Sequence, residues 1–131
     1  MDRRTVNKAE KERYTAIKES GCIATMIATG RYSQPPDVHH LTDGGRRRGW
    51  EYSIGLSPYH HRGLLPANMR RQRAMGIYGP SFAHGRREFE AFFGGDDYLL
   101  RVQNEVLRIY QEMPWFDYKP HRIVFQAIRE L

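Results

Sequence analysis

The sequence predicts an α+β fold in which a short strand–loop–strand–helix unit lies between an N-terminal helix and additional C-terminal helices. Three observations support this prediction. Apolar residues recur at helical spacing near both ends of the chain. Two short segments in the first half carry the apolar and β-branched or aromatic residues of strands, and the second alternates large with small or polar side chains. A serine–proline pair follows that second segment and is typical of a helix start.

The first helix is expected from about Thr5 to Ser20, and Gly21 is well placed to end it. A compact turn is expected next, from Cys22 to Gly30. The segment Tyr32–Pro36 cannot be helical because it ends in two prolines. The apolar face of the first helix would be formed by Val6, Ala9, Tyr14 and Ile17.

The central unit follows. Asp37–Leu41 is a strand candidate, and it leads into the loop Thr42–Gly49, which contains three consecutive arginines. Trp50–Leu56 has the period of a half-buried strand. Ser57 is then expected to cap a helix that has Pro58 at its first position.

The segment Leu64–Pro80 has no clean period and several arginines, so the sequence predicts a mobile basic loop there. Glycine and proline pairs then separate three helical patterns. These helices are expected over about Arg86 to Phe93, from an Asp96 or Asp97 cap to Met113, and over about Arg122 to Leu131.

The composition suits a globular protein that binds a polyanion. A chain of 131 residues with 40% hydrophobic residues is expected to form a single domain, with its core at about residues 21–63 and a helical part at about 79–131. It shows no long apolar stretch and no secretory signal, so a soluble intracellular protein is expected. One cysteine excludes an internal disulfide and a four-cysteine zinc site. The net charge of +6 favours nucleic acid as a partner.

Two adjacent histidine pairs, His39-His40 and His60-His61, lie on the predicted strand and helix of the central unit. Neighbouring residues point to opposite faces of a strand, and they lie about 100° apart on a helix. One member of each pair is therefore expected to face a shared site, and the other to do something else. Imidazoles serve as metal ligands and as general bases, which are the groups that metal-assisted phosphodiester hydrolysis requires.

A surface His-His pair is seldom catalytic, and arginine runs are usually solvated loops. Here, however, the two pairs bracket a compact unit that also carries Arg46, Arg47 and Arg48. The arginine guanidinium donates paired hydrogen bonds to phosphate oxygens, so this loop could bind a DNA backbone. The pattern therefore favours a metal-dependent nuclease.

The spacing of these motifs resembles the HNH nuclease core of the phage recombination enhancement function (Ref) family, whose members are RecA-dependent DNA nucleases. The resemblance covers roughly residues 21–107. Its motifs are Val38–Leu41, Gly44–Arg47, Ile54–Gly63, Gly79–Gly85 and Phe89–Ala91.

The resemblance implies a ββα-metal (HNH) core in which His39 and His61 bind the metal and His40 is the general base. It implies a divalent metal, with Mg or Mn favoured and Zn possible, and DNA as the substrate. A RecA filament is a further expected partner, and the expected location is the cytoplasm of a bacterial host that carries the phage or prophage. The expected DNA-contacting residues are Arg46, Arg47, Arg48 and Arg62.

Two departures from the family pattern stand out. Family members carry a pattern that resembles a structural zinc knuckle, with Cys-x-x-Cys in the turn and Cys-x-x-His at the helix start. The four corresponding positions here are Cys22, Thr25, Ser57 and His60. Structural zinc needs four thiolate or imidazole ligands, so this zinc is predicted to be absent. The cross-link that zinc would form between the turn and the helix is expected to be replaced by packing of Ile23, Met26, Ile54 and Tyr59.

The second departure is the asparagine-like middle position of the HNH motif, which falls on Tyr52 or Ser53. In the family this residue helps to orient the base through a hydrogen bond. Ser53 is the candidate for a weaker version, with a backbone carbonyl as the alternative.

Three functions compete. The first is an HNH-type DNA endonuclease that acts in recombination. The second is a DNA-binding recombination accessory protein that has lost catalysis, which the two departures favour. The third is a nuclease-like module that contacts a protein partner through its C-terminal helices. The retention of His39, His40 and His61 favours the first.

Overall fold

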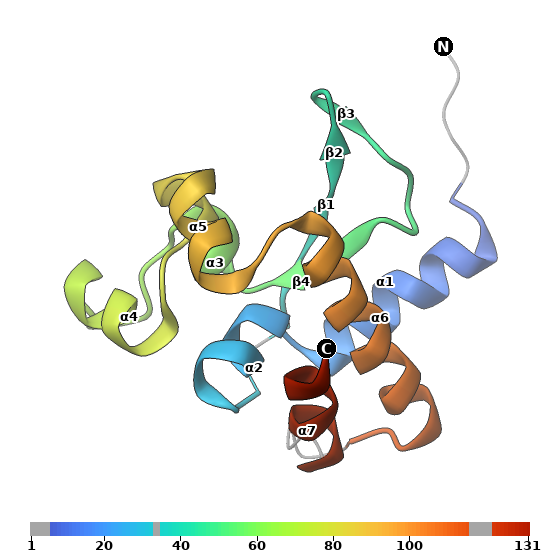
Figure 1. Cartoon of the computed structure of the whole chain (residues 1–131). Helices are drawn as coiled ribbons and strands as arrows, with labels where there is room; N and C mark the ends of the chain where they lie inside the picture. The colour runs from blue at the N-terminus through green and yellow to red at the C-terminus, as the bar shows by residue number, and fades with distance from the viewer. Residues whose placement is uncertain (1–5, 33–34, 116–121) are drawn as a thin grey trace.

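We describe a computed structural model of the chain, covering residues 6–32, 35–115 and 122–131. Its helices surround a small central sheet (Figure 1). The elements are, in order, α1 Lys8–Ser20, α2 Ile23–Thr29, β1 Asp37–His40, β2 Thr42–Asp43, β3 Arg46–Arg47, β4 Ser53–Leu56, α3 Pro58–Arg62, α4 Arg71–Tyr78, the 3-10 turn η1 Phe82–His84, α5 Arg86–Phe93, α6 Asp96–Glu112 and α7 Arg122–Glu130.

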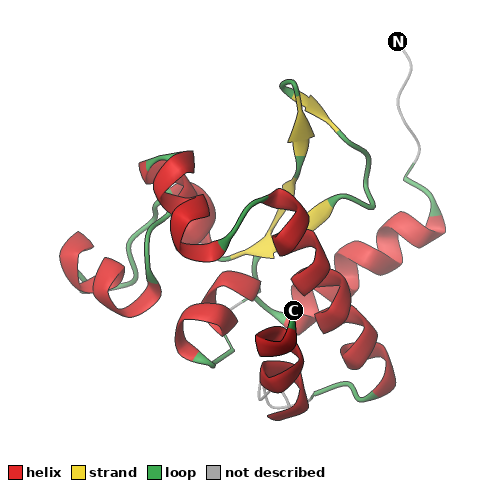
Figure 2. Cartoon of the chain, in the orientation of Figure 1, coloured by secondary structure: helices red, strands yellow, loops and turns green. Residues whose placement is uncertain are grey.

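The expected strand–strand–helix unit is present. Strands β1 and β4 pair antiparallel at the centre of the molecule (Figure 2). In their register, His39 is opposite Ile54 and His40 is opposite Ser53. Helix α3 follows β4 directly and contacts both strands. The Ser57 hydroxyl accepts a hydrogen bond from the backbone N–H of His60 at 3.0 Å, which confirms the predicted cap. The mixture of helices and small antiparallel sheets agrees with the α+β class.

The segment Thr42–Gly49, predicted as a loop, contains a short hairpin that the sequence interpretation did not identify. Strands β2 and β3 pair antiparallel and form the arm that extends from the central sheet in Figure 1. Gly44 and Gly45 have φ values of 58° and 82° at the turn. A two-residue hairpin turn with two positive φ angles matches the natural strand twist, and glycine adopts it without strain.

Two further segments that were not predicted to be helical contain helices. Cys22–Gly30 contains α2, whose N-terminus is capped by the Cys22 sulfur, 3.3 Å from the backbone nitrogen of Thr25. The expected mobile loop Leu64–Pro80 contains α4, which packs against α2. Helices of seven and eight residues are too short to show a clear period in the sequence, and tertiary packing supplies most of their stability.

The helices expected near both ends are present, with corrections to their details. In α1, Ile17 is buried as expected, but Ala9 is exposed, because only part of this helix packs on β1, β4 and α6. Val6, which was expected on the apolar face, lies before the helix and is also exposed. Gly95, and not an aspartate, is the N-cap of α6. Gly21 and Met113 end α1 and α6 as predicted.

The core joins the central sheet to the surrounding helices. It includes Ile23 and Met26 of α2, Ile54 of β4 and several residues of α6. Tyr59, also expected to pack near the altered zinc knuckle, is 4% exposed. Among the residues that the structure describes, no helix is both long enough and apolar enough to span a membrane.

Candidate metal-binding and catalytic site

The structure brings two of the predicted site residues together across β1 and α3. The ring centroids of His39 and His61 are 5.0 Å apart, with the rings edge to face. Phe82 of η1 lies against His39, at 5.1 Å between centroids, and so covers one side of the pair. The Ser57-Pro58 pair starts α3 directly after β4, and α3 contacts β1, the strand that carries His39.

Asp37, which the sequence interpretation did not single out, fixes the orientation of His61. Its Oδ2 atom is 3.0 Å from His61 Nδ1 and 2.7 Å from Arg62 Nε. Partial burial alone would raise the pKa of this carboxyl, but the bonds from Arg62 and His61 lower it below its usual value. An ionised carboxylate only accepts hydrogen bonds, so His61 Nδ1 donates and its Nε2 keeps the lone pair that can bind a metal.

The signal for Asp37 was its position two residues before His39 on the same strand. Residues at this spacing share one face of a strand. An acidic residue in register with a predicted ligand is therefore a candidate partner for a second histidine nearby.

His39 has the electronic state that a metal ligand requires. Burial, together with the positive charges of His61, His40 and Arg86, lowers the pKa of His39 to about 4. The ring is therefore neutral at physiological pH. Two imidazoles, one held by a carboxylate through its other nitrogen, fit a divalent ion that has open positions for water and phosphate. Among the described residues there is no cluster of three or more His, Cys, Asp or Glu side chains that could hold an ion.

His40 contacts a different part of the molecule. Its Nε2 atom is 2.9 Å from the hydroxyl of Tyr14 on α1, and the two rings are nearly perpendicular. Ser53, the residue expected to orient His40, uses its hydroxyl elsewhere: it donates to the carbonyl of Trp50 at 2.7 Å and accepts from Arg13 Nε at 3.0 Å.

The predicted DNA-contacting arginines differ in their surroundings. Arg46 and Arg47 are exposed on the β2–β3 hairpin. Arg48 lies 4.3 Å above the ring of Tyr52 and pairs with Asp97 at 3.4 Å. Arg62 bonds to the carboxylate that also holds His61, so it belongs to the histidine cluster.

The altered zinc knuckle forms a buried hydrogen-bonded group. The Sγ of Cys22 and the Nδ1 of His60 are 3.6 Å apart, and the Ser57 hydroxyl is 2.8 Å from the same nitrogen. His60 Nε2 donates to the Tyr78 carbonyl at 2.8 Å. Burial would raise the pKa of the Cys22 thiol, but the hydrogen bond and charge of His60 lower it to about 7. Burial would lower the pKa of His60, and the bonds to Cys22 and Tyr78 raise it instead.

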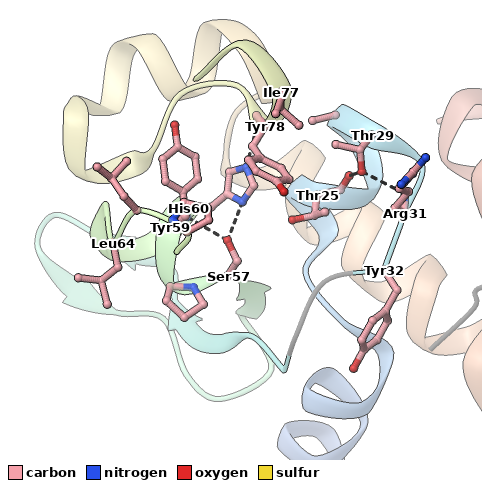
Figure 3. A pocket seen from close by; sticks show the side chains of 14 residues that line it. Thr25, Thr29, Arg31, Tyr32, Ser57, Tyr59, His60, Leu64, Ile77 and Tyr78 are labelled. Carbon is pink, nitrogen blue, oxygen red and sulfur yellow. Dashed lines mark hydrogen bonds between the residues drawn. The ribbon is translucent and has the colours of Figure 1, made fainter. Parts of the chain in front are cut away.

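A cavity of about 860 Å³ opens beside this buried group, between α2, α3 and α4 (Figure 3). Its walls include three of the four knuckle positions: Thr25, Ser57 and His60. His39, His40 and His61 do not line it. The predicted metal ligands and the predicted base therefore lie outside this cavity, and its volume does not mark the candidate site. Its other labelled walls in Figure 3 are Thr29, Arg31, Tyr32, Tyr59, Leu64, Ile77 and Tyr78.

A family model described as recombination enhancement, RecA-dependent nuclease matches residues 7–108. The chain belongs to this family. The predicted Ref resemblance is therefore confirmed. No curated protein matches the chain in sequence.

The match to the RecA-dependent nuclease family extends the resemblance predicted over about residues 21–107 on its N-terminal side. It begins at Asn7, whose side chain caps α1, and it ends within α6. All of the predicted site residues of this chain lie inside the match, and so does Tyr14. The family description places the chain among nucleases that act in recombination enhancement.

Proposed function

We propose that this RecA-dependent nuclease cuts DNA as an HNH-type endonuclease, with a divalent ion held by His39 and His61 and with His40 as the general base. The observation that carries the proposal is the pairing of the two rings at 5.0 Å, with the Asp37 carboxylate on His61 Nδ1. Histidine ligands of metals commonly donate their second ring N–H to a carboxylate in this way.

In this proposal, a bound ion supplies a Lewis acid for the phosphate oxygen; Mg²⁺ or Mn²⁺ is favoured, and Zn²⁺ is an alternative. His39 presents a neutral ring nitrogen, and the Asp37 carboxylate on His61 Nδ1 keeps the tautomer that leaves Nε2 for the ion. His40 takes the proton of the attacking water. The exposed Arg46 and Arg47 are placed to contact DNA phosphates on the hairpin arm.

We further propose that the chain folds without a structural zinc. The four knuckle positions supply one thiol and one imidazole, whereas Thr25 and Ser57 offer hydroxyls. The hydrogen bonds among Cys22, His60 and Ser57 and the packed core beneath them replace the cross-link that zinc would provide. Stoichiometric, tightly bound zinc that survives mutation of His39 and His61 would contradict this.

A second candidate function is a recombination accessory protein that binds DNA without cutting it. Two observations favour it: the loss of two knuckle ligands and the use of the Ser53 hydroxyl away from His40. This candidate shares the DNA surface with the first and differs only in chemistry.

Plasmid nicking separates the two candidates. We expect the wild-type protein to nick supercoiled plasmid with Mg²⁺ or Mn²⁺, on naked DNA or DNA that carries a RecA filament. His40→Ala should lose activity roughly 100-fold or more, because a general base contributes about 10²–10⁴ to a rate. An absence of nicking by the wild type with every divalent ion, with and without the filament, would favour the accessory protein.

A further inference from the structure

Helix α1 lies outside the strand–strand–helix unit, yet it supplies a direct contact to the proposed base. The Tyr14 hydroxyl is 2.9 Å from His40 Nε2, and the ring centroids are 5.7 Å apart at an interplanar angle of 84°. The two residues are 26 positions apart in sequence. This contact is therefore a product of how α1 docks on the sheet.

Arg13 holds α1 in this position. Its guanidinium donates to the Ser53 hydroxyl at 3.0 Å and to the Ser53 carbonyl at 2.6 Å. A third bond reaches Asn104 of α6 at 3.0 Å. Ser53 is the direct partner of His40 in the strand register, so Arg13 anchors α1 to the residue opposite the base. Its neighbour Tyr14 is thereby kept against the His40 ring.

The sequence assigns Ser53 or a backbone carbonyl to orient the base, and the structure offers a different group. A serine hydroxyl has one proton to donate, and Ser53 gives it to the Trp50 carbonyl. A tyrosine phenol is neutral at physiological pH and can accept a hydrogen bond from a ring N–H.

We propose that Tyr14 is a positioning residue for His40. Its hydroxyl accepts the Nε2–H of His40, which fixes the tautomer in which Nδ1 is the basic nitrogen. The role of Tyr14 in DNA cleavage rests on the proposed endonuclease function, whereas its effect on the tautomer of His40 does not.

The oxygen of water forms a bond to phosphorus while the bond from phosphorus to the leaving oxygen breaks. The proton of the water goes to His40 Nδ1, and the Nε2 proton stays in the bond to Tyr14. The leaving oxygen takes a proton from solvent.

The test compares Tyr14→Phe with Tyr110→Phe. Phenylalanine keeps the ring that packs against His40 and removes only the hydroxyl. Tyr110 of α6 also bonds to α1, through the Glu19 carboxylate, so the control removes a bond to the same helix away from His40. Metal-free protein labelled with ¹⁵N reports the tautomer of the His40 ring. The rate of plasmid nicking, measured across DNA concentrations, reports kcat and KM separately.

We expect the wild type and Tyr110→Phe to carry the His40 proton on Nε2, and Tyr14→Phe to show a mixture of both tautomers. The kcat of Tyr14→Phe should fall about tenfold at unchanged KM, the effect of one neutral hydrogen bond. An Nδ1-protonated ring in the wild type, or the same spectrum in Tyr14→Phe, would overturn the inference even if the protein cuts DNA. Conversely, a wild type that fails to cut while its tautomer depends on Tyr14 would refute the endonuclease proposal and leave the contact established.

Discussion

Two neighbouring histidines on one turn of α3 lie in opposite surroundings. His60 is fully buried and bonds to Cys22, Ser57 and the Tyr78 carbonyl. The His61 side chain is 27% exposed, bonds to Asp37 and faces the ring of His39. Adjacent residues on a helix point about 100° apart, so one short helix contributes to two regions. We call the surroundings of Cys22, Ser57 and His60 the closed region and the surroundings of Asp37, His39 and His61 the open region.

On the same helix, a histidine held by hydrogen bonds within the protein is therefore next to the histidine that we propose as a metal ligand. Both ring nitrogens of His60 are used within the protein, so its bonds hold α2, α3 and α4 together. At His61 only Nδ1 is engaged by Asp37, which leaves Nε2 for an ion. We propose that hydrogen bonds hold the region around His60 without zinc, whereas the cluster around His61 needs an exposed position for substrate.

The largest expected effect is the return of zinc to the closed region. The separation of Cys22 Sγ and His60 Nδ1 is 3.6 Å. Two tetrahedral zinc ligands, a thiolate at about 2.3 Å and an imidazole at about 2.0–2.1 Å, are also about 3.6 Å apart. We therefore expect the double variant Thr25→Cys/Ser57→Cys to bind one zinc tightly and to unfold at a higher temperature than the wild type. Zinc stoichiometry and thermal unfolding with and without a chelator measure this.

The matched control is Thr25→Ala/Ser57→Ala, which makes similar changes without adding thiols. If the double cysteine variant binds no more zinc than this control, the closed region does not have the geometry of a knuckle.

In the open region, His61→Ala should abolish most cutting and leave the fold intact. Removal of a ligand from a two-histidine site removes the Lewis acid, which contributes several kcal/mol, so a loss of about 100-fold or more is expected. Plasmid nicking and thermal unfolding are the measurements. Unchanged nicking would show that His61 is not a ligand.

In the closed region, His60→Ala should act mainly on stability. The substitution leaves a cavity in the core and deprives the Tyr78 carbonyl of its donor, for a cost of about 2–4 kcal/mol. Urea unfolding at fixed pH measures the free energy of unfolding. A cost for His61→Ala as large as that for His60→Ala would erase the distinction between the two regions.

A smaller effect is expected for Asp37→Asn. An amide can still donate or accept, but it does not hold His61 Nδ1–H as a carboxylate does, so metal affinity should fall about 10- to 100-fold. Titration calorimetry with Mn²⁺ or Zn²⁺ measures it. Asp97→Asn, which alters an ion pair with Arg48 on the surface, is the matched control. Equal affinities for both variants would remove Asp37 from the metal site.

The smallest effect concerns the arm that accompanies the open region. Arg46→Ala/Arg47→Ala should weaken DNA binding at low salt and flatten its salt dependence, because each phosphate contact adds about 0.9 to the slope of log K against log salt. Arg48→Ala serves as the comparison, since Arg48 is engaged by Tyr52 and Asp97. Fluorescence anisotropy across salt concentrations gives the slopes; identical slopes for wild type and the double variant would exclude the arm from the DNA interface.

Local sequence signals predicted the elements that carry the candidate site. The Ser57-Pro58 start of α3, the strand pair and the separation of the two histidine pairs were readable because capping, period and side-chain direction depend on neighbouring residues. Two short helices and a hairpin were missed. In α2 and α4 the stabilising contacts come from other elements, and no window of the sequence contains them.

The sequence alone therefore determined the α+β class, the family resemblance and the placing of the histidines on β1 and α3. Only the tertiary structure decided their partners. Asp37 meets His61 across 24 residues, and Tyr14 meets His40 across 26. Such contacts arise from the docking of whole elements through buried apolar faces. The type and spacing of the residues predicted the chemistry that each histidine ring could carry out. Only the packing of the elements determines which group contacts each ring nitrogen.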